Sequence, residues 1–409
     1  MKRTLFLRHG SSVLITVAVT ALALVVLTGC GSSSSSRNTQ TLQSVGKGEG
    51  AVNLVEWPGY VEPQWVKPFE QQTGCIVHNK DAGTSDQMVL LMRTGQYDGV
   101  SASGNATERL VDAGDVSPVN VKLVPNYATI FPDIKNQPYN TFGGVHYGIP
   151  HGRGANLLMW RTDHVTPGPN SWSVILDPSV AAKYKGHISA YDDPIYIADA
   201  AVYLKAHNPS LKISNPYELD KTQFNAAVNL LKQQRSNVGE YWGDATKQIQ
   251  SYTTGDDWVG TTWQYQYFQL AGKKVKVAIS PASQGFVPSE GATGWSDTWM
   301  ISSKAKHPNC MYKWMNWIVS PMANAEVAQF FGEAPAQSLA CQPATLAAAA
   351  QAIKYPPDPH FCDEYHASLP AFWSRVYYWR TPVANCGDSR GSVCMNYNDW
   401  VSAWTQIKG

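Results

Sequence analysis

The chain has 409 residues, and its 32 Lys and Arg residues nearly balance its 31 Asp and Glu residues, so the formal net charge is +1. This balance gives no indication of a nucleic-acid partner. The length is sufficient for two lobes, and the 15 Trp and 20 Tyr residues favour recognition through aromatic surfaces.

The N-terminal segment has the order of an export signal. A basic start precedes an apolar run at residues 13–26, and Leu-Thr-Gly-Cys follows at 27–30. A basic start, an apolar stretch and small residues at a cleavage point define such signals. The tetrapeptide resembles the bacterial lipobox, which implies a signal peptide at 1–29 and attachment of lipid to the thiol of Cys30. An ordinary secretory signal or an uncleaved anchor helix is the alternative.

A tether is expected next, because Ser, Gly, Gln and Asn dominate residues 31–50. With lipidated Cys30 in front of it, the segment 30–50 would hold the folded part outside the cytoplasmic membrane, in the periplasm or on the membrane's outer face. No later apolar run approaches the ~20 residues that a membrane-spanning helix needs.

The folded part begins with an alternation of strand and helix patterns. Strands are expected at 51–57, 75–78 and 97–100, and helices at 63–73 and 85–95. This alternation predicts an α/β lobe with a largely parallel sheet. Ligands of such sheets lie beyond the carboxyl ends of the strands, where the segments 57–60 and 101–105 fall.

A second lobe is predicted after a crossing near residues 146–154, and the chain returns near residue 294. Helices are expected in between at 198–206, 221–234 and 265–271, with a strand at 275–279. We therefore expect one lobe to contain 51–147 plus 295–409, with the C-terminal helices, and the other to contain 148–294.

Six cysteines remain after Cys30, and an even number outside the membrane favours disulfides over free thiols. Cys386 and Cys394 flank a short polar turn and are predicted to pair. Cys341 and Cys362 flank the helical stretch 343–354, which would leave Cys75 and Cys310. Six cysteines allow 15 pairings, and the sequence does not choose among them beyond the first pair. With no Cys-x-x-Cys and no clustered His, neither a metal nor a cofactor is expected.

Several short fragments follow one another along the chain in a characteristic order. They are Glu-Trp-Pro-Gly-Tyr-Val-Glu-Pro at 56–63, Tyr-Gly-Ile-Pro at 147–150, Ser-Trp at 171–172, Gly-Trp-Ser-Asp at 294–297 and Phe-Gly-Glu-Ala-Pro at 331–335. In this order they resemble the spermidine/putrescine-binding branch of bacterial ABC-transporter solute-binding proteins. The resemblance implies an α/β, two-lobed, periplasmic-binding-protein-like clamp of type II topology, with a hinge and a central cleft. Such a clamp closes on its ligand and docks onto a permease.

The resemblance also implies which residues line the cleft. A polyamine needs carboxylates for its ammonium groups and aromatic faces for its methylenes, and aromatic faces attract cations directly. The implied aromatic walls are Trp57, Tyr60, Trp263 and Trp295, and the implied carboxylates are Asp193 and Asp297. Trp57 and Trp263 as core residues, and Asp193 as a helix cap, are the alternative readings.

Three positions depart from the pattern of the resembling family. Tyr196 stands where an acidic residue is common, Glu333 stands where tyrosine is common, and Arg380 falls near a usual glutamine. A buried Arg380 would need an anionic partner, either Glu333 or an acidic group of the ligand. The first pairing leaves a polyamine site and the second suggests a zwitterion, while Arg380 outside the cleft is the third possibility.

The leading interpretation is therefore a monomeric, lipid-anchored binding protein that passes a polyamine to ABC permease subunits. A zwitterion or another small organic solute is the alternative ligand. A secreted hydrolase is a distant third, since the sequence has no His-Glu-x-x-His helix.

Overall fold

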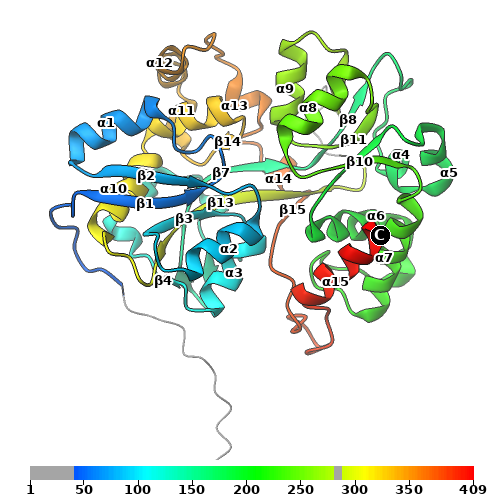
Figure 1. Ribbon diagram of the computed structural model, residues 1–409, viewed down its shortest axis with the longest axis horizontal. Coiled ribbons are helices and arrows are strands. Elements are labelled where there is room, and N and C mark those ends of the chain that lie inside the picture. Colours follow the sequence, from blue (N-terminus) through cyan, green and yellow to red (C-terminus); the bar gives the residue numbers. More distant parts are fainter. Residues whose placement is uncertain (1–40, 281–287) are drawn as a thin grey trace, which may run out of the picture. The chain divides into compact units, whose positions relative to one another are not determined.

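The computed structural model describes residues 41–280 and 288–409 (Figure 1). The predicted signal peptide, Cys30 and the first part of the tether lie outside the described residues. Within those two ranges, no helix combines the length and the hydropathy needed to cross a bilayer.

The larger sheet has eight strands in the order β14-β7-β13-β3-β1-β2, with β4 and β15 also paired to β13. β1 pairs in parallel with β2 and β3, as the sequence predicts, whereas β13 runs antiparallel to β3 and β7. The strands are β1 (Ala51–Glu56), β2 (Ile76–Asp81), β3 (Gly99–Ala102), β4 (Val116–Ser117), β7 (Ile149–Ala155), β13 (Ala292–Ser302), β14 (Ala334–Pro335) and β15 (Val376–Tyr378).

The smaller sheet has five strands in the order β10-β9-β11-β8-β12. β9 pairs in parallel with β10 and β11, and β8 is antiparallel to β11 and β12. The strands are β8 (Leu157–Arg161), β9 (Ile188–Tyr191), β10 (Val238–Trp242), β11 (Val259–Thr262) and β12 (Val277–Ile279), and β5 (Thr141–Phe142) pairs separately with β6 (Val145–His146).

Helices contact both sheets and each other. Those that follow the strands of the larger sheet are α1 (Pro63–Thr73), α2 (Ser85–Arg93), α3 (Gly104–Asp112), α10 (Pro308–Ile318), α11 (Pro321–Phe331) and α12 (Pro343–Ile353). Those between β8 and β13 are α4 (Ser173–Leu176), α5 (Pro178–Ala181), α6 (Ile197–His207), α7 (Lys221–Gln234), α8 (Ala245–Thr254) and α9 (Gln264–Gly272). The C-terminal helices are α13 (Phe361–Glu364), α14 (Pro370–Trp373) and α15 (Tyr397–Lys408).

Local sequence signals explain several helix boundaries. α1 starts at Pro63, whose missing N–H is not needed at a first position, and it stops at Gly74, whose φ of 70° suits glycine. α7 starts with a capping box, in which Asp220 and Gln223 each accept a hydrogen bond from the other's backbone N–H. The helix predictions for 63–73 and 221–234 agree with these bounds.

The sheets and helices divide the chain differently from the predicted boundaries at two places. β7 begins at Ile149 but belongs to the larger sheet, although 148–294 was expected to form one lobe. α15 packs against α7 and the 3₁₀ helix Pro194–Tyr196, although the C-terminal helices were expected with the first lobe (Figure 1). The apolar face of a helix can pack against many different elements. The periodicity of apolar residues in a helix therefore does not identify the element against which that helix packs.

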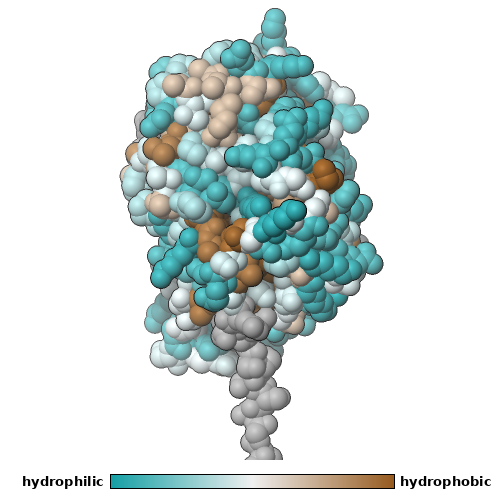
Figure 2. All heavy atoms as spheres, turned by 90° about the vertical axis from the view of Figure 1, so that its left-hand side faces the viewer, coloured by the Kyte–Doolittle hydropathy of each residue, from teal (hydrophilic) through white to brown (hydrophobic). Residues whose placement is uncertain are grey.

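Two large clusters of buried side chains form most of the described core, one centred on each sheet, and Ala325, Ala340 and Ala349 form a small third one. The face shown in Figure 2 is mainly hydrophilic, with apolar atoms in small groups. Ile76 and Leu90 are among the exposed large apolar residues, at 47% and 61% exposure.

Three disulfides connect six of the cysteines, which confirms the predicted Cys386–Cys394 bond. Cys341 bonds to Cys362, and Cys75 bonds to Cys310 across 235 residues of sequence. The last bond links the start of β2 to α10, and loss of such a native bond typically costs about 2–5 kcal/mol.

Candidate functional site

A buried carboxylate on the longest strand lies at the centre of the candidate site. Asp297 is 2% exposed, and its two oxygens accept hydrogen bonds from the hydroxyls of Tyr60 (2.6 Å) and Ser103. Burial raises the pKa of Asp297 to about 6, and the nearby His151 and the two hydroxyls oppose the rise. A carboxylate held this way is costly to ionise without a cation beside it.

A second buried carboxylate lies behind Tyr60. The Tyr60 hydroxyl is 3.0 Å from Oε2 of Glu333, and His151 Nδ1 is 3.4 Å from Oε1 of Glu333. His151 in turn lies 2.9 Å from the Ser101 hydroxyl. Tyr60 and Glu333 are both fully buried, so this network fixes the orientation of Asp297 from behind.

Two glycines of β7 make room for Trp295 of β13 and for Glu333. Trp295 pairs with Gly154 and Asp297 with Gly152, so the two pairs lie on the same face of the sheet. A Cβ at Gly154 would lie 2.4 Å from the Trp295 ring, and one at Gly152 would lie 2.0 Å from the carboxyl carbon of Glu333. A side chain at either position would therefore displace part of the site.

Aromatic rings surround Asp297 in a small inner cavity of about 20 Å³. The Trp295 ring is 6.5 Å from the Trp263 ring and 5.9 Å from the Phe331 ring, in both cases edge-to-face. The inner cavity is lined by Trp57, Ser103, Trp263, Trp295, Asp297, Phe331 and Trp379.

Four of these lining residues come directly after the carboxyl end of a strand. Trp57 follows β1, Ser103 follows β3, Trp263 follows β11, and Trp379 follows β15. The site thus occupies the position at which α/β sheets bind ligands, and it draws on both sheets.

A larger outer cavity of about 220 Å³ continues from the inner one. The two share Trp57, Trp263, Trp295 and Phe331. The rest of the outer lining is formed by Pro58, Gly59, Gly83, Gly243, Asp244, Ala245, Thr246, Tyr265, Phe330 and Gly332. No Lys, Arg or His is among the described residues that line either cavity.

The structure brings together four of the nine residues predicted to contact a ligand: Trp57, Trp263, Trp295 and Asp297 line the inner cavity. Tyr60 and Glu333 lie behind Asp297 instead of in the lining. The pattern that places Trp295 and Asp297 two residues apart on a strand predicted their common face correctly.

Asp193 and Tyr196 lie elsewhere, since neither lines the two cavities. Asp193 accepts a hydrogen bond from the Ile195 N–H (2.9 Å), which is the capping role that the sequence offered as an alternative. Burial raises its pKa to about 7. The Tyr196 hydroxyl accepts a hydrogen bond from Gln234 (3.0 Å) inside the core, with its ring edge-to-face against Trp404.

Of the three possibilities for Arg380, the structure agrees with a position outside the cleft and does not show a pairing with Glu333. The Arg380 guanidinium donates to Glu218 at 2.9 Å, and both side chains are partly exposed, at 33% and 19%. Arg380 does not line either cavity, although the preceding Trp379 does. Adjacent residues of an extended segment point in opposite directions, which separates the two side chains.

Sequence reasoning missed Ser103, Phe331 and Trp379 as lining residues. Ser103 lies in the segment 101–105 that was expected at a strand end, so its position carried a usable signal. Phe331 opens the fragment 331–335 and Trp379 precedes Arg380, so both stand near residues that were named as candidates, although neither was named itself.

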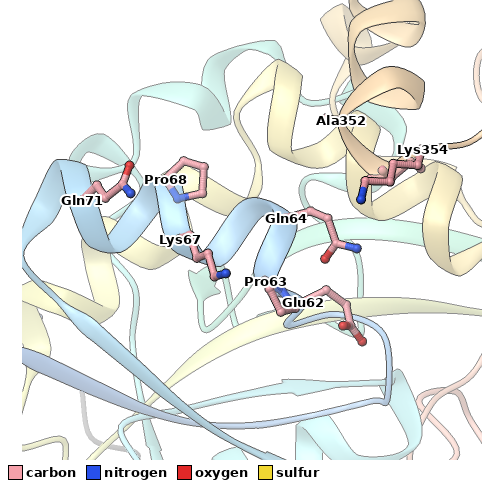
Figure 3. Close-up of a pocket in the computed structure, with 9 residues that line it drawn as sticks. Glu62, Pro63, Gln64, Lys67, Pro68, Gln71, Ala352 and Lys354 are labelled. Carbon is pink, nitrogen blue, oxygen red and sulfur yellow. The ribbon is translucent and has the colours of Figure 1, made fainter.

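A separate groove of about 590 Å³ lies between α1 and the end of α12 (Figure 3). It is lined by Glu62, Pro63, Gln64, Lys67, Pro68, Gln71, Ala352, Ile353 and Lys354. No aromatic residue is among these, and the side chains are mostly polar, so the groove lacks the enclosing apolar walls typical of a small-molecule site.

Comparison with known proteins adds independent findings. The family model described as "Bacterial extracellular solute-binding protein" matches residues 64–355, well over half of the chain. The putrescine/cadaverine-binding protein of Pseudomonas aeruginosa is 24% identical over 292 residues, covering 68% of this chain and 77% of that protein. The spermidine/putrescine-binding periplasmic protein of Escherichia coli is 26% identical over 282 residues, covering 68% and 74%.

Among solved structures, a putative spermidine/putrescine ABC transporter protein from Listeria monocytogenes superposes with a TM-score of 0.67. It is 15% identical, and the superposition covers 88% of this chain and 99% of that one. A likeness at this identity establishes the fold, and it confirms the α/β clamp class that the sequence predicts.

Proposed function

Because the chain belongs to the family of bacterial extracellular solute-binding proteins, we propose that it captures a polyamine of the putrescine or spermidine class for an ABC importer. As a member of this family it is an extracytoplasmic binding protein and not an enzyme. In the proposal it acts as a monomer, and its ligand-bound form docks onto the membrane permease.

The charge of the cavity lining is the observation that carries the proposal. The inner cavity has one carboxylate, Asp297, surrounded by aromatic rings, and the described lining of both cavities has no basic side chain. An ammonium group that leaves water needs an anionic partner, and aromatic faces stabilise it by a further ~0.5–2 kcal/mol each. This lining suits a cation and offers no cationic partner to an anion.

The cavity dimensions favour a primary amine over a bulky quaternary one. The inner cavity of about 20 Å³ holds roughly one water-sized group. A primary ammonium is about that size, and its methylene chain would extend past Trp263 and Trp295 into the outer cavity of about 220 Å³.

A zwitterionic ligand would need a basic side chain in the cavity, and Arg380 was the candidate. We expect Arg380→Gln to leave the putrescine dissociation constant within about twofold of the parent value, because Arg380 lines neither cavity and pairs with Glu218 instead. Isothermal calorimetry checks this, with Glu218→Gln as the matched control from the same pair. A tenfold or greater loss of putrescine affinity in Arg380→Gln, but not in Glu218→Gln, would show that Arg380 belongs to the ligand site.

Attachment through lipid on Cys30 is a second part of the proposal, supported by the Leu-Thr-Gly-Cys sequence at 27–30. Cys30→Ala removes the thiol that would carry the lipid. It should therefore release the protein from membranes or leave the precursor uncleaved, as seen by fractionation and mass spectrometry of the intact chain. A Cys30→Ala protein that is cleaved and membrane-bound like the parent contradicts the anchor.

A thermal-shift screen tests the ligand class. Putrescine and spermidine should raise the melting temperature, since a ligand at a hundredfold excess over its dissociation constant adds ~2.7 kcal/mol of stability. The control is 1,4-butanediol, which has the carbon chain of putrescine without the charges and should have no effect. Stabilisation by glutamate or glucose, with none by the amines, would overturn the proposal.

A further inference from the structure

The second charge of a diamine has no evident partner among the predicted acids of the smaller-sheet region. Asp193 caps a 3₁₀ helix and the neighbouring position holds Tyr196, whose hydroxyl bonds to Gln234. Neither lines the inner or the outer cavity. If Asp297 binds one ammonium group, the other ammonium group must either bind a carboxylate in the outer cavity or remain in solvent.

The outer cavity has one carboxylate among the described residues that line it. The outer cavity shares four aromatic residues with the inner one and extends to the β10–α8 connection, residues 243–244, and to the first residues of α8. Asp244 belongs to this lining and is exposed. Asp244 lines only the outer cavity, whereas Asp297 lines only the inner one.

The local structure leaves part of the Asp244 carboxylate available. One oxygen, Oδ1, accepts the backbone N–H of Thr246 at 2.6 Å and so caps α8. The nearby Lys247 is paired with Glu240 at 2.9 Å. The second oxygen of Asp244 can therefore accept from a ligand while the first keeps its place at the helix end.

We infer that Asp244 binds the second ammonium group of the ligand at the mouth of the cavity. This inference rests on the proposed function. Asp297 belongs to β13 of the larger sheet and Asp244 follows β10 of the smaller sheet, so a dication contacts both sheets through its two ends. A monoamine contacts only the inner carboxylate. Asp244 is then the residue that distinguishes diamines from monoamines.

The expected effect is modest, because Asp244 is exposed and lies at a helix N-terminus, which itself repels cations. Asp244→Asn should weaken putrescine binding about two- to fivefold at low ionic strength, and less at high ionic strength. Asparagine caps helices as well as aspartate does, so this substitution removes the charge and retains the cap.

The test is calorimetry of the full protein with putrescine and with butylamine, which lacks the second ammonium group. Asp244→Asn should weaken putrescine binding and leave butylamine binding unchanged. Asp220→Asn, at the corresponding cap of α7, is the matched control and should change neither. Unchanged putrescine affinity, or equal losses for both amines, in Asp244→Asn overturns the inference. Failure of the parent protein to bind either amine instead overturns the proposed function.

Discussion

Asp297→Asn is expected to weaken putrescine binding at least tenfold while the protein remains folded. Removing one partner of a desolvated charge pair costs about 2–5 kcal/mol, because the other charge stays buried without compensation. The amide has nearly the size of the carboxylate, and its oxygen can accept from one of the two hydroxyls, of Tyr60 and Ser103, while its NH2 can donate to the other. Calorimetry gives the affinity, and thermal unfolding without ligand checks the fold.

Asp199→Asn is the matched control for this substitution. Asp199 is also a buried aspartate, 5% exposed, and accepts a hydrogen bond from Thr293 at 2.9 Å, but it lines neither cavity. It should leave putrescine affinity unchanged. A parent-like affinity in Asp297→Asn would exclude Asp297 as the anchor, whichever ligand the protein binds.

The affinity for putrescine should fall as the pH drops below about 6. A cation needs ionised Asp297, whose pKa is raised to about 6 by burial, while the ammonium groups stay protonated throughout. Each pH unit below that value should therefore cost about tenfold in affinity. Calorimetry from pH 4.5 to 8 measures the profile, and Asp297→Asn should abolish this step.

The pH dependence that Asp297 gives to folding stability is opposite in sign to the pH dependence that it gives to putrescine binding. The two effects can therefore be distinguished. Its pKa in the folded state, about 6, lies above the ordinary value of 3.8. The stability contribution of this carboxyl is therefore fully present below pH 3.8 and is lost as the pH rises through about 6. A loss of binding at pH 5 thus cannot come from destabilisation by this group. A putrescine affinity that is flat between pH 5 and 8 would contradict the assigned role.

The predicted residues that line the inner cavity were named from the family resemblance, and short-range patterns explain why they come together. Trp295 and Asp297 share a face because side chains on a strand alternate with period two. Trp57 and Trp263 follow strands, and strand ends are where α/β sheets bind ligands. The predicted bond between Cys386 and Cys394 spans only 8 residues.

The parts that the sequence did not predict depend on contacts between distant segments. Arg380 meets Glu218 across 162 residues, and Tyr60 meets Glu333 across 273. An aspartate before a short helix looks the same whether it caps the helix or faces a ligand, so Asp193 was ambiguous. Only the assembled sheets show that Asp297 and Asp244 line two cavities that share four lining residues.

The most direct test of the central claim is a crystal structure of the protein with putrescine or spermidine bound. The account predicts an ammonium nitrogen within hydrogen-bond distance of Asp297, about 2.7–3.2 Å, and methylenes packed between Trp263 and Trp295. A ligand bound outside this cavity, or one whose charged groups avoid Asp297, would contradict the account.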